Sequence, residues 1–151
     1  MNCMIFYRVS HFFFEKKIPF LPWFITKLGY LIFNSHIPAS TEIGSKSKCA
    51  YGGIGVVVHG KAKIGSRVII GQGVTIGRQL SPVGVPHIGN DVYISAGSRI
   101  LGDIKIGNNV IIGANSVVIR DVPDNCIVAG VPAKVVRYID VPVYEMLENV
   151  F

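Results

Sequence analysis

The sequence predicts a mainly β-structured domain wound as a parallel β-helix, and a six-residue period is the main reason. Over residues 58–118 an aliphatic residue returns at every sixth position, and only Pro82 breaks the phase. Glycine usually follows the aliphatic residue. This period fits neither an α-helix nor an alternating strand. Stacked coils would bury the aliphatic residues in one column, and glycine would allow tight corners. The aliphatic positions are Val58, Ile64, Ile70, Ile76, Ile88, Ile94, Ile100, Ile106, Ile112 and Val118.

Length and composition indicate one globular domain with an apolar surface. The chain has 151 residues, of which 50% are hydrophobic and 16% charged. Disorder is therefore excluded, and part of the apolar surface is expected to face a partner subunit or a membrane. The net charge of +6 favours polyanionic partners such as phosphates, acidic glycans or anionic lipids. No cluster of lysine and arginine has nucleic-acid geometry, so no nucleic-acid partner is predicted.

The cysteines indicate a reducing, cytoplasmic location. Cys3, Cys49 and Cys126 lie far apart and form no CxxC motif. An odd, scattered set argues against a disulfide framework, so all three are interpreted as buried thiols.

Residues 1–33 form a separate segment, rich in aromatic residues and interrupted by charges. Pro19 and Pro22 predict two short amphipathic helices, one on each side. No apolar run approaches the roughly 20 residues of a transmembrane helix, and a signal peptide fits poorly. We favour a cap over the open end of the β-helix. The alternative is a membrane-surface helix pair with lysines at the headgroups, which would place the protein at the inner membrane surface.

The remaining interruptions of the repeat are expected to carry function. Gly52, Gly53 and Gly55 allow unusual backbone geometry and a close approach by another group. Residues 78–86 are polar, rich in glycine and proline, and predict a loop that bulges from one corner. Residues 120–139 read as the last coil and its exit. We divide the chain into the N-terminal segment 1–33, the β-helix domain 34–137 and a tail 138–151 with one short helix.

Three motifs resemble the hexapeptide-repeat acyltransferases: IGNDVYISAG (residues 88–97), IGNNVIIGANSVV (106–118) and DVPDNCIVAGVPAKVV (121–136). The chain is most similar to the serine acetyltransferase branch, which includes relatives that acetylate sugars of bacterial surface polysaccharides. The resemblance covers residues 34–137, and VAGVPAK is its most specific part. It implies a left-handed β-helix and a homotrimer with active sites between neighbouring prisms.

The resemblance also implies acetyl-CoA as co-substrate, lying along the groove between subunits. Carried over by motif, its contacts would be Ala96, Ala114, Arg120 and Lys134. The two cations can neutralise the phosphates of coenzyme A. No metal is predicted, because the paired histidines of a zinc enzyme with this fold are missing.

Acetyl transfer to a hydroxyl needs a general base, and histidine suits that role near neutral pH. We predict His59 as the base, because it stands where glycine is typical and its corner should lie near the loop 78–86. His36, His87 and Tyr51 are predicted substrate contacts, whereas His11 is interpreted as structural.

The chain departs from serine acetyltransferases at their catalytic corner. Their histidine, in an Asp-His-Ala-Thr-Gly corner, aligns with Gly52, with Tyr51 beside it, and their paired aspartate falls near Ser35 or His36. The long helical N-terminal domain is replaced by residues 1–33. We therefore predict an O-acetyltransferase acting on a sugar of a surface polysaccharide or its precursor. Two alternatives stay open: a serine O-acetyltransferase of cysteine biosynthesis, and a non-catalytic β-helix scaffold.

Overall fold

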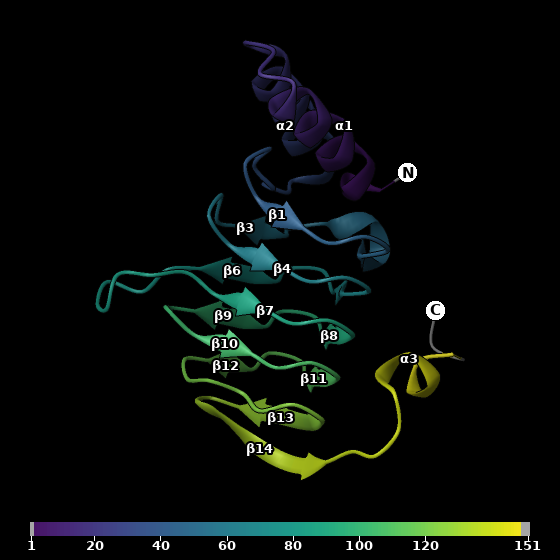
Figure 1. Cartoon of the computed structure of the whole chain (residues 1–151), viewed down its shortest axis with the longest axis vertical. Coiled ribbons are helices and arrows are strands. Elements are labelled where there is room, and N and C mark those ends of the chain that lie inside the picture. The colour runs from purple at the N-terminus through teal and green to yellow at the C-terminus, as the bar shows by residue number, and fades with distance from the viewer. Residues whose placement is uncertain (1, 149–151) are drawn as a thin grey trace.

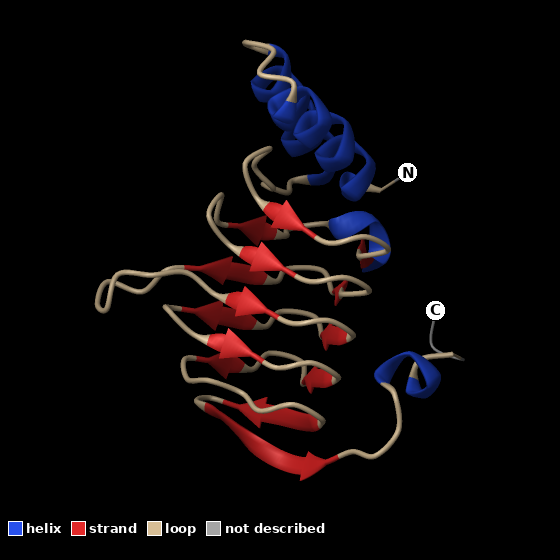
Figure 2. Cartoon of the chain, in the orientation of Figure 1, coloured by secondary structure: helices blue, strands red, loops and turns tan. Residues whose placement is uncertain are grey.

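The structure, a computed structural model that describes residues 2–148, is a three-sided prism of stacked coils with a pair of helices at one end (Figures 1 and 2). Each side of the prism is one sheet. The first contains β1 (Glu42–Ile43), β4 (Lys63–Ile64), β7 (His87–Ile88) and β10 (Lys105–Ile106). The second contains β2 (Lys48–Cys49), β5 (Ile69–Ile70), β8 (Val92–Ile94), β11 (Val110–Ile112), β13 (Cys126–Gly130) and β14 (Ala133–Tyr138). The third contains β3 (Val57–Val58), β6 (Thr75–Gly77), β9 (Arg99–Leu101) and β12 (Val117–Val118).

The aliphatic column of the repeat forms the core, which confirms the predicted parallel β-helix. Each of the ten positions is at most 5% exposed. Parallel pairing stacks them in register, as where Ile94 pairs with Ile70 on one side and Ile112 on the other. One hexad forms one side of the prism, so three hexads close a coil. Burial of the column removes a continuous apolar stripe from water.

Three corners join the sheets, and each has its own chemistry. The asparagine corner (residues 44–47, 65–68, 89–91, 107–109 and 123–125) joins the first and second sheets. The glycine corner (50–56, 71–74, 95–98 and 113–116) joins the second and third. The loop corner (59–62, 78–86, 102–104 and 119–121) joins the third to the first.

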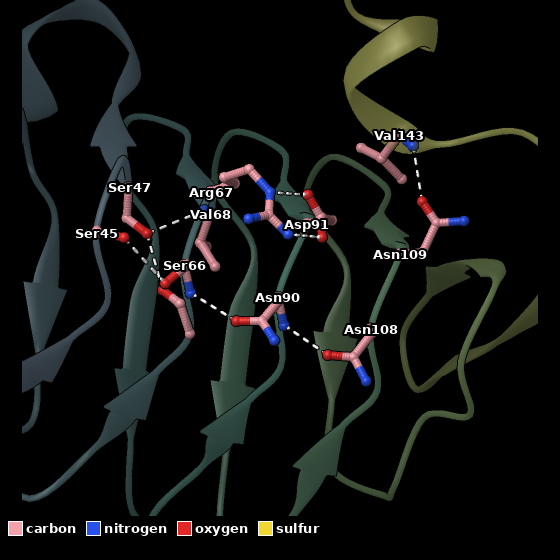
Figure 3. A network of polar contacts seen from close by, with 11 residues as sticks. Ser45, Ser47, Ser66, Arg67, Val68, Asn90, Asp91, Asn108, Asn109 and Val143 are labelled. Carbon is pink, nitrogen blue, oxygen red and sulfur yellow. Dashed lines mark hydrogen bonds and ion pairs between the residues drawn. The ribbon is translucent and has the colours of Figure 1, made fainter.

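The asparagine corner is held by a ladder of side-chain to backbone hydrogen bonds (Figure 3). The N–H of Ser66 donates to Oδ1 of Asn90 at 2.8 Å, and the N–H of Asn90 donates to Oδ1 of Asn108 at 2.8 Å. Beside this ladder, Arg67 donates two hydrogen bonds of 2.6 Å to the carboxylate of Asp91. These contacts satisfy backbone groups at the turns and fix the stacking of successive coils. We assign this corner a structural role.

The N-terminal helices close one end of the prism. Cys3, Met4 and Tyr7 of α1 (Cys3–Glu15) and Phe33 of α2 (Leu21–Phe33) belong to the same buried cluster as the aliphatic column. The hydroxyl of Tyr7 donates to the carbonyl of Thr41 at 2.7 Å, and the Arg8 guanidinium donates to the carbonyls of residues 43 and 44. The segment therefore caps the open core.

The 3₁₀ turn η1 (Ala50–Gly53) explains the glycine-rich interruption before β3. Gly53 has a φ of +86°, and a Cβ placed there would collide with Sγ of Cys3. The group that approaches Gly53 is thus the capping helix. Cys3 and Cys49 are both buried free thiols, as is Cys126. The hydrogen bond that the Cys49 thiol donates to Cys3, and then burial, raise the pKa of Cys49.

At the other end, β13 continues the parallel stack and then turns back into β14 as an antiparallel hairpin. Val131 and Pro132 lie in its turn, where the missing N–H of proline costs no ladder bond. The chain then folds over the asparagine corner, and α3 (Val143–Met146) supplies the short helix expected in the tail. Residues 149–151 of that tail lie outside the described residues. Within residues 2–148, no helix is long and apolar enough to cross a membrane.

Candidate active site

The loop corner brings His59 together with residues 78–86. The N–H of His59 donates to the carbonyl of Ile76 at 2.8 Å, and the N–H of Lys63 donates to the carbonyl of Pro86 at 3.2 Å. The loop therefore leaves and re-enters the prism directly beside the coil of His59, as expected. Figure 2 shows it extending away from the prism as the longest excursion of the ladder. Leu80, near its tip, is 95% exposed.

The ring of His59 is half-buried and has one nitrogen occupied. Its Nδ1 accepts a hydrogen bond of 3.2 Å from the backbone N–H of Lys61. A neutral imidazole that accepts at Nδ1 carries its proton on Nε2. The other ring nitrogen is then a donor, so His59 must release Lys61 before Nε2 can take a proton. His59 as general base stays a prediction, and this contact sets a condition on it.

His36 lies on the outer face of the third sheet, one coil nearer the cap. Its N–H donates to the carbonyl of Val56 at 2.7 Å, and its carbonyl accepts from the N–H of Val58 at 2.8 Å. The side chain lines an apolar pocket between α2 and the first coil, beside Trp23. Burial, and then the positive charge of Lys27, hold the pKa of His36 below its ordinary value. The imidazole is therefore neutral near pH 7, the form in which it can accept a proton.

His87 begins β7 and lies on the outer face of the first sheet rather than at the tip of the loop corner. It pairs in register with Lys63 and Lys105 and lines a groove shared with His11. Nδ1 of His11 lies 2.7 Å from the carbonyl of Ala39, and its ring stacks on Tyr7. These contacts agree with the structural role expected of His11.

Tyr51, Ala96 and Ala114 lie at the glycine corner. Tyr51 is 70% exposed and has a left-handed backbone with a φ of +49°. Here the coils approach closely, since a Cβ on Gly71 would lie 2.7 Å from the backbone nitrogen of Ala96. Ala96 and Ala114 as contacts of coenzyme A stay a prediction.

Arg120 and Lys134 lie apart. Arg120 is exposed at the loop corner, whereas Lys134 lies on β14 opposite Ala129, at the end of the second sheet that borders the glycine corner. Among residues 2–148 neither forms a salt bridge. Arg120 and Lys134 as contacts of the coenzyme A phosphates stay a prediction.

Arg99, which no motif of the sequence marks, begins β9 at the edge of the third sheet that borders the glycine corner. Its Nη1 donates to the carbonyls of Gly97 at 2.8 Å and of Ser98 at 3.2 Å. In the sequence, the only sign of this role is a charged residue at a strand position that faces outward. The arginine orders the carbonyl edge of the glycine corner.

One protomer thus divides the candidates between two edges of the third sheet. Tyr51, Ala96 and Ala114 lie at the glycine corner, whereas His59 and Arg120 lie at the loop corner. Within residues 2–148, no group of three histidine, cysteine or acidic side chains is placed to hold a metal ion.

The family model for the bacterial transferase hexapeptide, described as six repeats, matches residues 86–120. The serine acetyltransferase of Synechococcus elongatus is 36% identical over 137 residues, which cover 89% of this chain and 56% of that protein. The chain belongs to the hexapeptide-repeat transferases. The serine acetyltransferase of Bacillus subtilis is 35% identical over 132 residues, covering 86% of this chain and 60% of that protein. The chain therefore spans little more than half the length of these relatives.

Solved structures agree with the family. The serine acetyltransferase in complex with coenzyme A from Brucella abortus superposes with a TM-score of 0.84 at 31% identity, over 90% of this chain and 55% of that chain. The Neisseria gonorrhoeae serine acetyltransferase gives a TM-score of 0.82 at 32% identity, over 99% of this chain and 58% of that chain. These neighbours confirm the left-handed hand of the β-helix and the short N-terminal helices.

Proposed function

We propose that this chain is an acetyl-CoA-dependent O-acetyltransferase whose acceptor is L-serine. The observation that carries the proposal is the similarity to serine acetyltransferases along nearly the whole chain, at 36% identity over 89% of its length. One structural neighbour is a complex with coenzyme A. The sugar acceptor predicted from the sequence has no counterpart among these relatives, so serine takes precedence over it.

The division of the candidates supports a homotrimer. The glycine corner and the loop corner lie at opposite edges of one sheet, so one chain does not bring Ala96 and Ala114 close to His59. A second copy that turns its loop corner toward the glycine corner of the first would complete a cleft. The exposed Leu80 and Val83 of residues 78–86 suit such a contact. In that assembly, Arg120 and Lys134 would reach one cofactor from two subunits.

The proposed chemistry is a balanced acyl transfer. The acceptor hydroxyl loses its proton to a histidine while its oxygen bonds to the acetyl carbonyl carbon, and the carbon–sulfur bond then breaks to release coenzyme A as a thiolate. His59 is the proposed base: once Lys61 no longer donates to Nδ1, the ring proton can lie on Nδ1, and Nε2 can then accept the proton of the hydroxyl. His36, His87 and Tyr51 are proposed to contact the acceptor. His36 is the second candidate for the base because its imidazole is held neutral.

The test is release of the coenzyme A thiol from acetyl-CoA, measured with L-serine, with nucleotide sugars and without acceptor. We expect serine-dependent release, and His59→Asn should lower kcat/KM by about 10²- to 10⁴-fold. His36→Asn and His87→Asn are the matched variants. If His59→Asn keeps most of the activity and His36→Asn loses it, His36 is the base. Release that depends on a sugar and not on serine would overturn the proposed acceptor.

A scaffold without catalysis is the second candidate. It is favoured by Gly52 and Tyr51 at the corner where serine acetyltransferases are expected to carry histidine, and by the occupied Nδ1 of His59. Calorimetry with coenzyme A separates the two functions. An enzyme must bind the cofactor, so the absence of a binding heat would reject catalysis. Binding without turnover of any acceptor would instead identify a scaffold that keeps the cofactor groove.

A further inference from the structure

The outer face of α2 exposes a group of large apolar side chains to solvent. Phe20 is 85% exposed, Leu31 79%, Trp23 65% and Phe24 59%. We call these four residues the aromatic face. Phe20 immediately precedes α2, and the other three lie on the helix, whose only charged residue is Lys27. A helix that is apolar on all sides is normally buried in a protein core or in lipid.

The opposite side of α2 already makes its contacts within the chain. Pro22, Gly29 and Phe33 are buried, and a Cβ on Gly29 would lie 3.3 Å from Cβ of Phe6 on α1. That side provides the packing that the cap requires. The aromatic face points away from it, and Figure 1 shows the turn between the helices as the end of the molecule farthest from the prism.

Charge around the aromatic face is positive. Lys16 and Lys17 lie in the turn before Phe20, and Lys27 follows Trp23 by one helical turn; all three are exposed. The only acidic residue of residues 1–33 is Glu15, which lies 3.6 Å from His11. Exposed aromatic side chains beside lysines match the interface of an anionic bilayer, where rings enter the headgroup region and ammonium groups meet phosphates.

The turn between α1 and α2 has an unusual backbone that exposes Lys17 and Phe20 to solvent. Lys17 and Phe20 both have left-handed φ values, of +55° and +64°, which are uncommon for residues with a side chain. The turn joins α1 to α2 in this conformation. Phe20 is more exposed there than any other residue of the aromatic face.

The length of α2 decides between lying on a membrane and spanning it. Its 13 residues measure about 20 Å, against roughly 30 Å of hydrocarbon in a bilayer. We propose that the aromatic face, with Lys16, Lys17 and Lys27, docks the protein on the surface of an anionic phospholipid bilayer. The prism then stands clear of the membrane at the end of the helix pair. This docking does not depend on which acceptor the enzyme uses.

Vesicle binding by the full chain tests the proposal. Trp23 is the only tryptophan, so its fluorescence reports directly on the aromatic face. With vesicles of phosphatidylcholine mixed with phosphatidylglycerol, we expect the protein to pellet, the Trp23 emission to shift to shorter wavelength and its quenching by acrylamide to fall. Because one lysine contributes about fivefold near an anionic surface, Lys16→Glu with Lys17→Glu should weaken binding at least about tenfold at low salt.

Phe20→Ser with Phe24→Ser should weaken binding by a similar factor while keeping the fluorescent probe. Tyr144→Ser and Lys105→Glu are the matched controls, since they change exposed residues far from the helix pair, and both should bind as the wild type does. A thermal transition equal to that of the wild type shows that each variant folds.

Three results would overturn the proposal. The first is no pelleting with anionic vesicles, and the second is equal binding to vesicles of phosphatidylcholine alone. The third is self-association: a Trp23 emission already shifted without lipid, with a doubled assembly mass that the Phe20→Ser, Phe24→Ser variant abolishes. That third result would assign the aromatic face to a second copy of the chain.

Discussion

Two glycines of the repeat provide a matched test of what glycine does after each buried aliphatic residue. Gly71 follows Ile70, and Gly77 follows Ile76. A Cβ on Gly71 would lie 2.7 Å from the backbone nitrogen of Ala96, with two more backbone atoms of that coil at 2.9 and 3.0 Å. On Gly77 the nearest atoms are side-chain carbons at 3.8 and 3.9 Å, and φ lies outside the left-handed region. We therefore expect Gly71→Ala and Gly77→Ala to behave differently.

The geometry sets the size of the difference. Backbone atoms closer than 3.0 Å cannot yield like the end of a flexible side chain, so Gly71→Ala must separate two coils. Such overpacking typically costs about 1–3 kcal/mol. For a chain of this size, that lowers the midpoint of thermal unfolding by about 2–12 °C. Alanine at Gly77 meets only ordinary van der Waals contacts, and it should stabilise by about 0.4–1 kcal/mol through the lower entropy of the unfolded chain.

Urea and thermal unfolding followed by far-ultraviolet circular dichroism measure both variants. Protein concentration must be equal in all samples, because assembly of subunits adds to the apparent stability. A Gly71→Ala protein as stable as the wild type would refute the argument from close coil contact. Equal losses at both positions would show instead that glycine is needed for its backbone freedom and not for space.

Two further predictions concern the cap. Tyr7→Phe removes the hydroxyl that donates to the carbonyl of Thr41, so the free energy of unfolding in urea should fall by about 1 kcal/mol. The control Phe12→Tyr, at an exposed position, should leave the free energy of unfolding unchanged. The pKa of His36 is lowered in the folded protein, so the unfolded chain binds a proton first as pH falls below about 6.5. Stability should therefore decline from that pH down to the folded pKa, and His36→Gln should show a flatter dependence of its urea midpoint on pH.

The six-residue ladder was predictable from the sequence because every sixth residue is buried and must therefore be aliphatic. Ile70, Ile94 and Ile112 stack in register, and each must be aliphatic whatever the protein does. The two helices were predictable from proline placement. The antiparallel return of β14 was not, because its residues alternate no differently from those of a further coil. Its direction is decided by the turn at Pro132.

The candidate site was less predictable, because its geometry depends on contacts that do not require particular residue types. The sequence shows that His59 stands at a corner, and it does not show that Lys61 donates to Nδ1. Nor does it show that α2 and the first coil form the pocket that His36 lines. The proximity of residues 78–86 to His59 was predicted because hexad counting places both on the same corner.

The choice of acceptor follows from the same distinction. Identity in a repeat protein accumulates at positions fixed by burial and by tight corners, which several activities share. The departure at Gly52 weakens the assignment to serine and the short segment 1–33 favours a sugar, whereas similarity across the chain to serine acetyltransferases favours serine. Only the few residues outside the ladder can decide the chemistry, so the acceptor assay carries more weight than further comparison of the coils.

Residues with an exposed apolar side chain, some of them with an unusual backbone conformation, indicate where this molecule contacts a partner. Tyr51 and Phe20 have left-handed backbones that a tyrosine or phenylalanine seldom adopts, and both are largely exposed. Leu80 extends an apolar side chain into solvent at the end of the longest loop. Lys46 and Arg67 have similar φ values at the structural asparagine corner, so it is the exposure of large apolar side chains that indicates functional surfaces. Tyr51 and Leu80 belong to the two corners that a neighbouring subunit would unite, whereas Phe20 belongs to neither. The separate position of Phe20 argues that the helix pair has a partner of its own.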